Sequence, residues 1–247
     1  MVDTGEARVS ALKGVGPQLE GKLAGLGVHS VIDLLFHLPI RYQDRTTTLA
    51  IGELRSGSEV LISGRIEASG VQFGRRRSLI TVISDDTGRL TVRQFHFNAS
   101  QRRGLKRGAF IQCYGEVRSG PTGLEMVHPE YRLIEGPDAV EVETTLTPVY
   151  PTTEGIGQRR WRDLTGQALA RCGEAAPELL GDWAGFEFSD LPLSEALTLL
   201  HRPPAGVDLE TLKAGTHPAQ QRLAFEELLA NHLAVRRRRE RRDALSA

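Results

Sequence analysis

Apolar and polar side chains alternate at every second position along much of the stretch from Val60 to Ile134. This period is the pattern of half-buried β-strands, whose successive side chains point to opposite faces. Strands are predicted over 60–67, 79–84, 90–93, 111–117 and 124–133. The sequence Asp85-Asp86-Thr87-Gly88 is typical of a tight hairpin turn between the second and third strands. Five short antiparallel strands in about 75 residues fit a small closed barrel, of which the OB-fold is the commonest five-stranded kind.

The segments on both sides of the predicted barrel have the apolar period of helices. Residues 10–38 predict short helices, which Gly14-Val15-Gly16-Pro17 interrupts with a tight turn to make a helical hairpin. Helical patterning resumes after Pro148, and residues 217–245 predict one long helix. We therefore expect an α+β multidomain chain. Its regions are a helix-hairpin-helix-like hairpin at 1–50, a five-stranded OB-fold β-barrel at 51–147, and a helical region with a long terminal helix at 148–247.

The charge of the chain is unevenly distributed. Its 31 basic and 31 acidic residues give a formal net charge of zero, which alone argues against a nucleic-acid partner. However, ten basic and three acidic residues lie between Arg65 and Arg107, a net charge of +7. Twelve acidic residues and four arginines lie between Glu135 and Glu195, a net charge of −8. The predicted barrel is thus basic beside an acidic neighbour, and we expect nucleic acid to meet the barrel.

A basic loop and an aromatic strand form the candidate site on the predicted barrel. Phe95 and Phe97 fall on the outward face of the third strand with Arg93, if Leu90 and Val92 face the core. Outward rings suit stacking on unpaired bases. Further arginines that suit phosphate contact are Arg75, Arg76, Arg77, Arg102 and Arg103. Two alternatives stay open, namely a solvated charged loop and a β-bulge that returns the phenylalanines to the core.

The glycine turn near the start of the chain is a second candidate site. Gly14 and Gly16 lie between two predicted helices, where backbone amides can face a phosphate. A hairpin that only packs against the barrel needs the same glycines, so both interpretations stay open. The run from Gly16 to Lys22 also matches seven positions of the nucleotide-binding loop G-x-x-x-x-G-K-[ST]. Leu23 lacks the hydroxyl that holds magnesium, so no nucleotide site is expected here.

Other kinds of site are not expected. The seven histidines include no pair at metal-ligand spacing, so neither a metal nor a catalytic histidine is predicted. Cys113 and Cys172 are too few for a disulfide framework, which indicates reduced thiols in a cytoplasm. No signal peptide pattern follows Met1, and no apolar run approaches the roughly 18 residues of a membrane span. We expect a monomer with no cofactor in this chain and no membrane contact.

Short phrases spread over most of the chain carry a family resemblance. They are Leu12 to Pro17, Asp33 to Pro39 with Arg41-Tyr42 and Asp44-Arg45, His128-Pro129-Glu130-Tyr131, Leu146 to Gly155, Leu200 to Pro204, and His217 to Leu229. In these phrases the chain resembles the N-terminal region of the RecG family, bacterial ATP-dependent helicases that remodel stalled forks and Holliday junctions. The resemblance implies a role in DNA repair and recombination and a place at the bacterial nucleoid.

The resemblance also implies a wedge domain, an OB-fold that splits the arms of branched DNA while a motor pulls the DNA past it. Aromatic residues of the third strand cap exposed base pairs in that picture, which gives Phe95 and Phe97 this role. Gln94 stands where relatives can carry another aromatic residue. A further implied partner is the single-stranded DNA-binding protein.

In the RecG family, a complete phosphate loop and an acidic magnesium-binding box would follow this region. We therefore expect ATP and magnesium only in motor domains beyond Ala247, and no ATP hydrolysis by this chain alone. The leading hypothesis is structure-selective binding of branched DNA, namely stalled forks and Holliday junctions. The alternative is an OB-fold docking module that recruits a partner such as the single-stranded DNA-binding protein.

Overall fold

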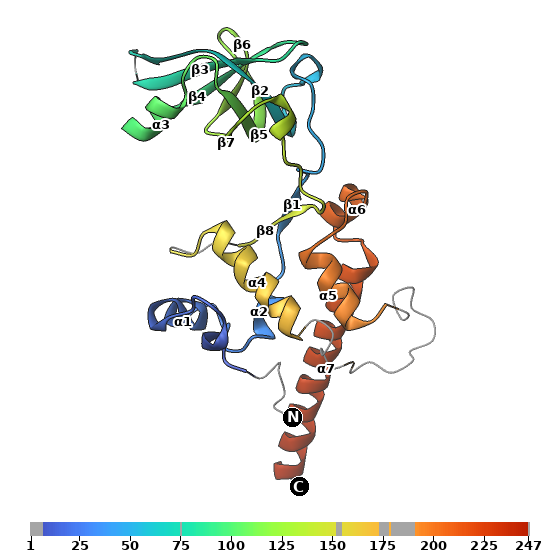
Figure 1. The fold of residues 1–247 in the computed structure, drawn as a ribbon. Helices are drawn as coiled ribbons and strands as arrows, with labels where there is room; N and C mark the ends of the chain where they lie inside the picture. The colour runs from blue at the N-terminus through green and yellow to red at the C-terminus, as the bar shows by residue number, and fades with distance from the viewer. Residues whose placement is uncertain (1–6, 75, 152–154, 173–177, 179–190, 247) are drawn as a thin grey trace. The chain divides into compact units, whose positions relative to one another are not determined.

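The computed structural model describes residues 7–74, 76–151, 155–172, 178 and 191–246. They form two compact units, drawn in Figure 1. The barrel unit spans Gln43–Thr147, and the helical unit combines Met1–Tyr42 with Pro148–Ala247. Strands β1 (Arg41–Gln43) and β8 (Thr147–Val149) pair with each other where the chain passes between the units.

Six strands of the barrel unit form one sheet that closes on itself. They are β2 (Glu59–Gln72), β3 (Ser78–Ser84), β4 (Arg89–Gln94), β5 (Phe110–Gly120), β6 (Gly123–Val127) and β7 (Glu130–Ile134). Their order is β2-β3-β4-β6-β5-β7, and an additional pairing of β2 with β5 closes the barrel. β4 and β6 run parallel, and the other pairs are antiparallel. The strands β2 to β6 thus have the connectivity of the OB-fold, which confirms the predicted fold class.

The alternation in the sequence decides which side chains fill the barrel. Leu79 and Ile83 of β3 are buried, whereas Ile80 and Val82 between them are only half-buried. Leu90 and Val92 of β4 face the core, as expected. Each fully buried aliphatic side chain stabilises the fold by about 1.5–3 kcal/mol. A strand that slipped by one residue would lose several such contributions together, so the pattern fixes the register.

The predicted turn between β3 and β4 is present. Oδ1 of Asp85 accepts hydrogen bonds from the N–H groups of Thr87 and Gly88 at 2.8 and 2.9 Å, and Oδ2 accepts one from Ile51 N–H at 2.8 Å. Burial alone would raise the pKa of Asp85, but these hydrogen bonds bring the pKa below its usual value. The turn therefore places Ser84 opposite Arg89 and sets the register of the hairpin.

The fifth predicted strand, 124–133, is two strands in the structure. β6 ends at Val127, and β7 begins at Glu130. Between them His128 has a left-handed backbone, with φ of 51°, and Pro129 has no N–H to donate to a strand ladder. The expectation of one continuous strand is wrong because these two residues turn the chain. β7 thus adds a sixth strand, which pairs with β5.

Helices make up most of the helical unit. They are the 3-10 helix η1 (Val9–Ala11), α1 (Pro17–Ala24), α2 (Asp33–Phe36), α4 (Gln158–Cys172), α5 (Leu193–His201), α6 (Leu209–Ala214) and α7 (Pro218–Ser246). The predicted long terminal helix corresponds to α7. Among the described residues, no helix has both the length and the apolar character of a membrane span.

Regions 1–50 and 148–247 are predicted as separate regions, but in the structure helices from both pack together in one unit. α2 lies against α4 and α5 (Figure 1), and Leu34, Leu35 and Trp161 from these elements are fully buried. The Tyr42 hydroxyl donates to the carbonyl oxygen of Leu200 at 2.9 Å. Short helices bury little apolar surface by themselves, so the first and third predicted regions join into one unit around a shared core.

Candidate nucleic-acid interface

The two phenylalanines of the candidate site follow the end of β4. The N–H of Phe95 donates to Nε2 of His128 at 3.1 Å, and the ring centroids are 5.8 Å apart. The Phe97 ring packs against the barrel core, and the guanidinium carbon of Arg77 lies 4.8 Å from its centroid. Both phenylalanines are half-buried. The expectation of two outward rings is wrong for Phe97, because β4 ends before Phe95 and the alternation stops there.

The short helix α3 (Ala99–Gly104) comes next and positions two arginines. Oδ1 of Asn98 accepts the N–H of Gln101 at 2.8 Å, and Oε1 of Gln101 accepts the N–H of Asn98 at 2.9 Å. This capping box fixes the start of the helix, and Arg102 and Arg103 are exposed on its last turn. A cavity of about 340 Å³ beside α3 is lined by Arg77, Phe97, Asn98, Ala99, Arg102 and Arg103. The structure thus brings four of the predicted site residues together.

The remaining predicted arginines are placed differently. Arg76 is exposed in the loop between β2 and β3, whereas Arg75 lies outside the described residues. Nε of Arg93 lies 2.9 Å from Oε2 of Glu125, and the two side chains are 16% and 12% exposed. Arg93 also borders a groove of about 670 Å³ that runs over β3 and β4. Its charge is balanced by Glu125, so Arg93 attracts an anion less than the exposed arginines do.

The glycine turn is occupied by contacts inside the helical unit. Gly14 has a left-handed backbone, with φ of 83°, as the tight turn requires. Arg160 of α4 donates to the Gly14 carbonyl oxygen, and Gln167 of α4 accepts the Lys13 N–H at 2.8 Å. These contacts favour a packing role over phosphate binding, although the partner is α4 and not the barrel as predicted. Gly16 precedes the first residue of α1 and is exposed.

The run from Gly16 to Lys22 is not a nucleotide-binding loop. Its residues from Pro17 onward belong to α1, and the element before α1 is the 3-10 helix η1. A nucleotide-binding loop instead follows a strand and wraps its free amides around phosphates. Both the local fold and the missing hydroxyl at Leu23 therefore argue against a nucleotide-binding loop at this place.

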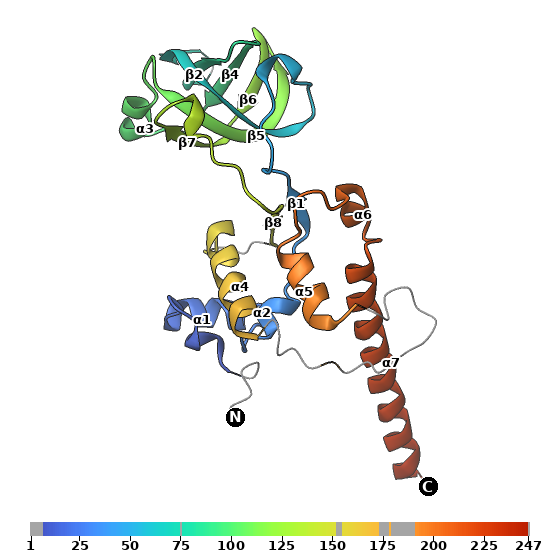
Figure 2. The same ribbon diagram turned by 45° about the vertical axis from the view of Figure 1, so that its right-hand side comes forward.

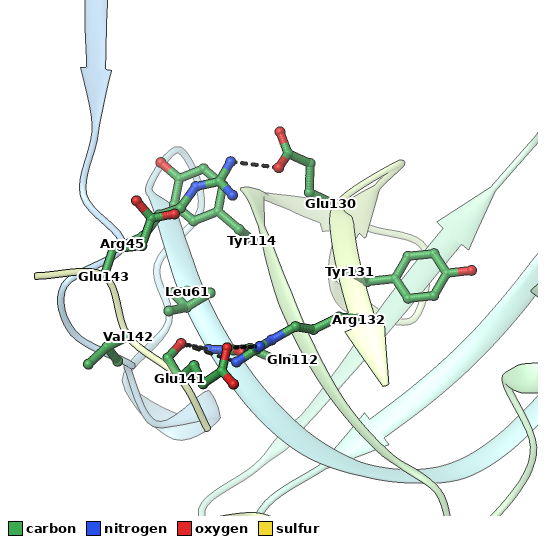
Figure 3. Close-up of a pocket in the computed structure, with 10 residues that line it drawn as sticks. All are labelled: Arg45, Leu61, Gln112, Tyr114, Glu130, Tyr131, Arg132, Glu141, Val142 and Glu143. Carbon is green, nitrogen blue, oxygen red and sulfur yellow. Dashed lines mark hydrogen bonds and ion pairs between the residues drawn. The ribbon is translucent and has the colours of Figure 1, made fainter. Parts of the chain in front are cut away.

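The barrel unit has a second cavity, of about 340 Å³, for which the sequence carries no signal (Figure 3). Arg45 donates to Glu130 at 2.7 Å, and its guanidinium carbon lies 4.3 Å from the centroid of the Tyr114 ring. On the other side of the cavity Arg132 forms an ion pair with Glu141. The lining has two arginines and three glutamates, so this cavity has no excess positive charge with which to attract phosphates.

The described residues include no group of three His, Cys, Asp or Glu side chains that could hold a metal ion. Cys113 and Cys172, both among the described residues, are buried and form no disulfide. Burial raises the pKa of Cys113 to about 12, because a thiolate is poorly solvated in the barrel core. Cys113 is therefore a packing residue and not a nucleophile.

Comparisons with known proteins agree with this architecture. The family model of the RecG wedge domain matches residues 9–171. The ATP-dependent DNA helicase RecG of Pasteurella multocida is 45% identical over 236 residues, which cover 93% of this chain and 33% of the relative. The RecG of Escherichia coli K12 is 46% identical over 228 residues, with 92% and 33% covered.

A solved structure of RecG bound to a three-way DNA junction has the same fold. It superposes with a TM-score of 0.66 at 25% sequence identity, and the match covers 96% of this chain and 32% of that one. The chain thus spans about a third of the length of the relatives it matches. Because the family model covers more than half of the sequence, the chain belongs to the RecG wedge domain family.

Proposed function

We propose that this chain binds branched DNA by its structure, as the wedge region of a RecG-type helicase that acts on stalled forks and Holliday junctions. The observation that carries the proposal is the cluster of Arg77, Arg102 and Arg103 around Phe97, two residues along the chain from Phe95. Guanidinium groups neutralise phosphates, and a neighbouring ring suits a base that has lost its partner. The relative of the same fold that is bound to a three-way junction supports this assignment.

The proposed contact reads the shape of the DNA and not its sequence. Arginines on a loop and on a helix end meet phosphates, which every sequence presents alike. Rings stack on bases of any type, because every base has a π-face. Binding is therefore expected to weaken steeply with salt, since each neutralised phosphate releases a counterion.

The test compares affinities for a three-way junction, a four-way junction and a plain duplex of equal length. Fluorescence anisotropy at several salt concentrations gives each dissociation constant and its salt dependence. The proposal expects junctions to bind about tenfold more tightly than duplex, which corresponds to about 1.4 kcal/mol. Equal affinities for all three DNAs would reject the wedge role.

A matched pair of variants locates the interface. Arg102→Gln with Arg103→Gln removes two exposed charges from the cluster, and junction affinity should fall together with the salt slope. Arg237→Gln with Arg238→Gln removes two exposed charges from α7 and serves as the control. If both double variants lost junction affinity equally, any exposed arginine would contribute to binding, and the cluster would not be the binding site.

A groove beside α3 favours a second candidate function, the docking of a partner such as the single-stranded DNA-binding protein. Among the described strands, β7 pairs only with β5, and α3 lies beside β7 (Figure 2). The groove between them has a volume of about 470 Å³ and includes Leu133, which is 46% exposed. An extended peptide can add to such a strand edge. Titration with the acidic tail of the single-stranded DNA-binding protein, with and without junction DNA, separates docking from DNA binding.

We further propose that ATP and magnesium act in the part of a RecG-type protein that this chain does not match, and that the chain by itself turns over no ATP. Purified protein should show no ATPase activity above background, with or without junction DNA, and measurable turnover would contradict this.

We also propose that the chain acts as a monomer at the nucleoid. Sedimentation of the DNA complex should give one copy per junction.

A further inference from the structure

We propose that His96 and His128 join Phe95 in one surface of rings that stacks on bases exposed at the branch, an inference that rests on the proposed function. The ring centroids of Phe95 and His128 are 5.8 Å apart, and those of His96 and His128 are 5.7 Å apart. Both histidines are exposed, whereas Phe97 is engaged by Arg77 and the barrel core. Of the rings that follow β4 or lie in the turn between β6 and β7, the three not engaged in this way are those of Phe95, His96 and His128, here called the ring surface.

The fold holds His128 beside Phe95 from two directions. β4 and β6 run parallel with Arg93 opposite Val127, and the His128 N–H donates to the carbonyl oxygen of Arg93 at 2.9 Å. In return, the Phe95 N–H donates to Nε2 of His128 at 3.1 Å. The hydrogen bond from the His128 N–H to Arg93 positions the imidazole, and the hydrogen bond from the Phe95 N–H to the imidazole positions the phenylalanine. The two segments, 33 residues apart in the sequence, thus support each other.

The backbone of His128 is strained, and the residue at this strained position carries a ring. Among the described residues, His128 is the only non-glycine residue with a positive φ, at 51°. A side chain in the left-handed region costs free energy that glycine would avoid, and such outliers gather at functional sites. A glycine here would relieve the strain but would lose both the acceptor for Phe95 and the exposed ring. The strained histidine is therefore consistent with a use for its ring.

The hydrogen bond to Phe95 also decides how His128 can meet DNA. Nε2 accepts the hydrogen bond from the Phe95 N–H, so this edge of the ring is already engaged. The part of the imidazole that is left for DNA is therefore its flat π-face. Histidine rings stack on unpaired bases in the same way as other aromatic rings. Phosphate contact remains with the arginines around Phe97, and base contact belongs to the ring surface.

The experiment measures junction and duplex affinities for His96→Ala, His128→Asn and His96→Tyr. Asparagine tolerates the left-handed backbone, so His128→Asn removes the ring while it keeps the turn. We expect His96→Ala and His128→Asn to bind the junction roughly fivefold more weakly or worse, with duplex affinity unchanged. His96→Tyr keeps a ring and should bind as the wild-type protein does. His232→Ala, at an exposed position on α7, is the matched control and should change nothing.

The outcomes separate this inference from the proposed function. Wild-type protein that shows no preference for junctions would reject the proposed function and the ring surface with it. A wild-type preference that persists in His96→Ala and His128→Asn would overturn the ring surface alone. The ring surface would also be overturned if His96→Lys bound the junction as the wild-type protein does while His96→Tyr did not. That result would mean that a positive charge, and not a ring, is needed at position 96. Circular dichroism identifies any variant that fails to fold, and if His128→Asn fails, His96→Ala decides the question, since His96 lies outside the strands.

Discussion

The Tyr150 hydroxyl lies 2.8 Å from Nδ1 of His201 in the core of the helical unit. The other ring nitrogen, Nε2, lies 2.8 Å from the carbonyl oxygen of Leu35. A carbonyl oxygen only accepts, so Nε2 carries a proton. Burial lowers the pKa of His201 and keeps the imidazole neutral, so Nδ1 accepts from the tyrosine. Through the imidazole, α2, the segment after β8 and α5 are joined by hydrogen bonds as well as by apolar contact.

The helical unit should therefore lose stability in mild acid. Burial lowers the pKa of His201 from 6.5 to about 4, although the bond to Leu35 acts in the opposite direction. The unfolded chain takes up the proton more readily than the folded one, so this stability is present above pH 6.5 and is lost as the pH falls toward 4. Between pH 7.5 and pH 5 the free energy of unfolding should fall by about 2 kcal/mol. Urea unfolding followed by circular dichroism at both values measures it, and equal stabilities would contradict the neutral buried ring.

The two glycines of the N-terminal turn should respond differently to alanine. In Gly14→Ala, a Cβ atom would lie 2.6 Å from Nη2 of Arg160, on a backbone with φ of 83°. We expect a loss of about 1–3 kcal/mol in unfolding free energy. Gly16 has an ordinary φ of −95° and no atom within 4 Å of its added Cβ, so Gly16→Ala is the matched control with little effect.

The same glycine pair tests whether the turn touches DNA. If the turn only packs, folded Gly14→Ala and Gly16→Ala proteins should bind the junction as the wild-type protein does. Junction binding is measured below the melting temperature of each variant. A large loss of affinity in folded Gly16→Ala would restore the phosphate-binding interpretation of the hairpin.

Phe95 and Phe97 should separate binding from stability. Phe97 packs against the barrel core, so Phe97→Ala should lower the unfolding free energy of the barrel unit by about 1–3 kcal/mol. Phe95→Ala should cost less stability and more junction affinity, because its ring belongs to the ring surface. Thermal melts and anisotropy titrations of both single variants give the comparison. The reverse ranking would show that Phe97 is the ring that meets DNA.

Local patterns in the sequence predict the barrel because each of its elements is specified locally. The alternation in β3 and the Asp85 turn determine the hairpin without reference to the rest of the chain. The end of β4 could not be predicted in this way, since the alternation has no mark at Gln94. A local signal for α3 was present but missed, namely Asn98 followed three residues later by Gln101. Pro129 likewise marks the break between β6 and β7.

Most of the features that local sequence patterns do not predict depend on contacts between residues far apart in the sequence. His96 and His128 are at no recognisable spacing, and only the parallel pairing of β4 with β6 brings their rings together. The same holds for Gly14 and Arg160, which are 146 residues apart. Charge counts predicted a basic barrel but not the pairing of Arg93 with Glu125. Periodicity reports local structure, whereas a binding surface depends on which distant segments meet.

The ion pair of Arg93 and Glu125 should restrain the affinity of the barrel for DNA. Glu125→Gln keeps the shape of the side chain and releases the charge of Arg93, which lies on the same strand that leads to Phe95. One more free cation should raise junction affinity about threefold at low salt and steepen the salt slope by up to about one unit. The change should also cost about 1–3 kcal/mol of stability, because Arg93 is largely buried.

A second ion pair of the barrel unit provides the matched control. Nη2 of Arg118 lies 2.6 Å from Oε2 of Glu116, and both side chains are about half exposed, at 57% and 43%. Glu116→Gln frees a cation in the same way but on β5, which is one strand farther from β4 than β6, the strand of Glu125. It should change the net charge equally and leave the junction preference over duplex as it was. If Glu116→Gln raises junction affinity as much as Glu125→Gln does, then net charge alone governs binding, and Arg93 has no particular place beside the DNA.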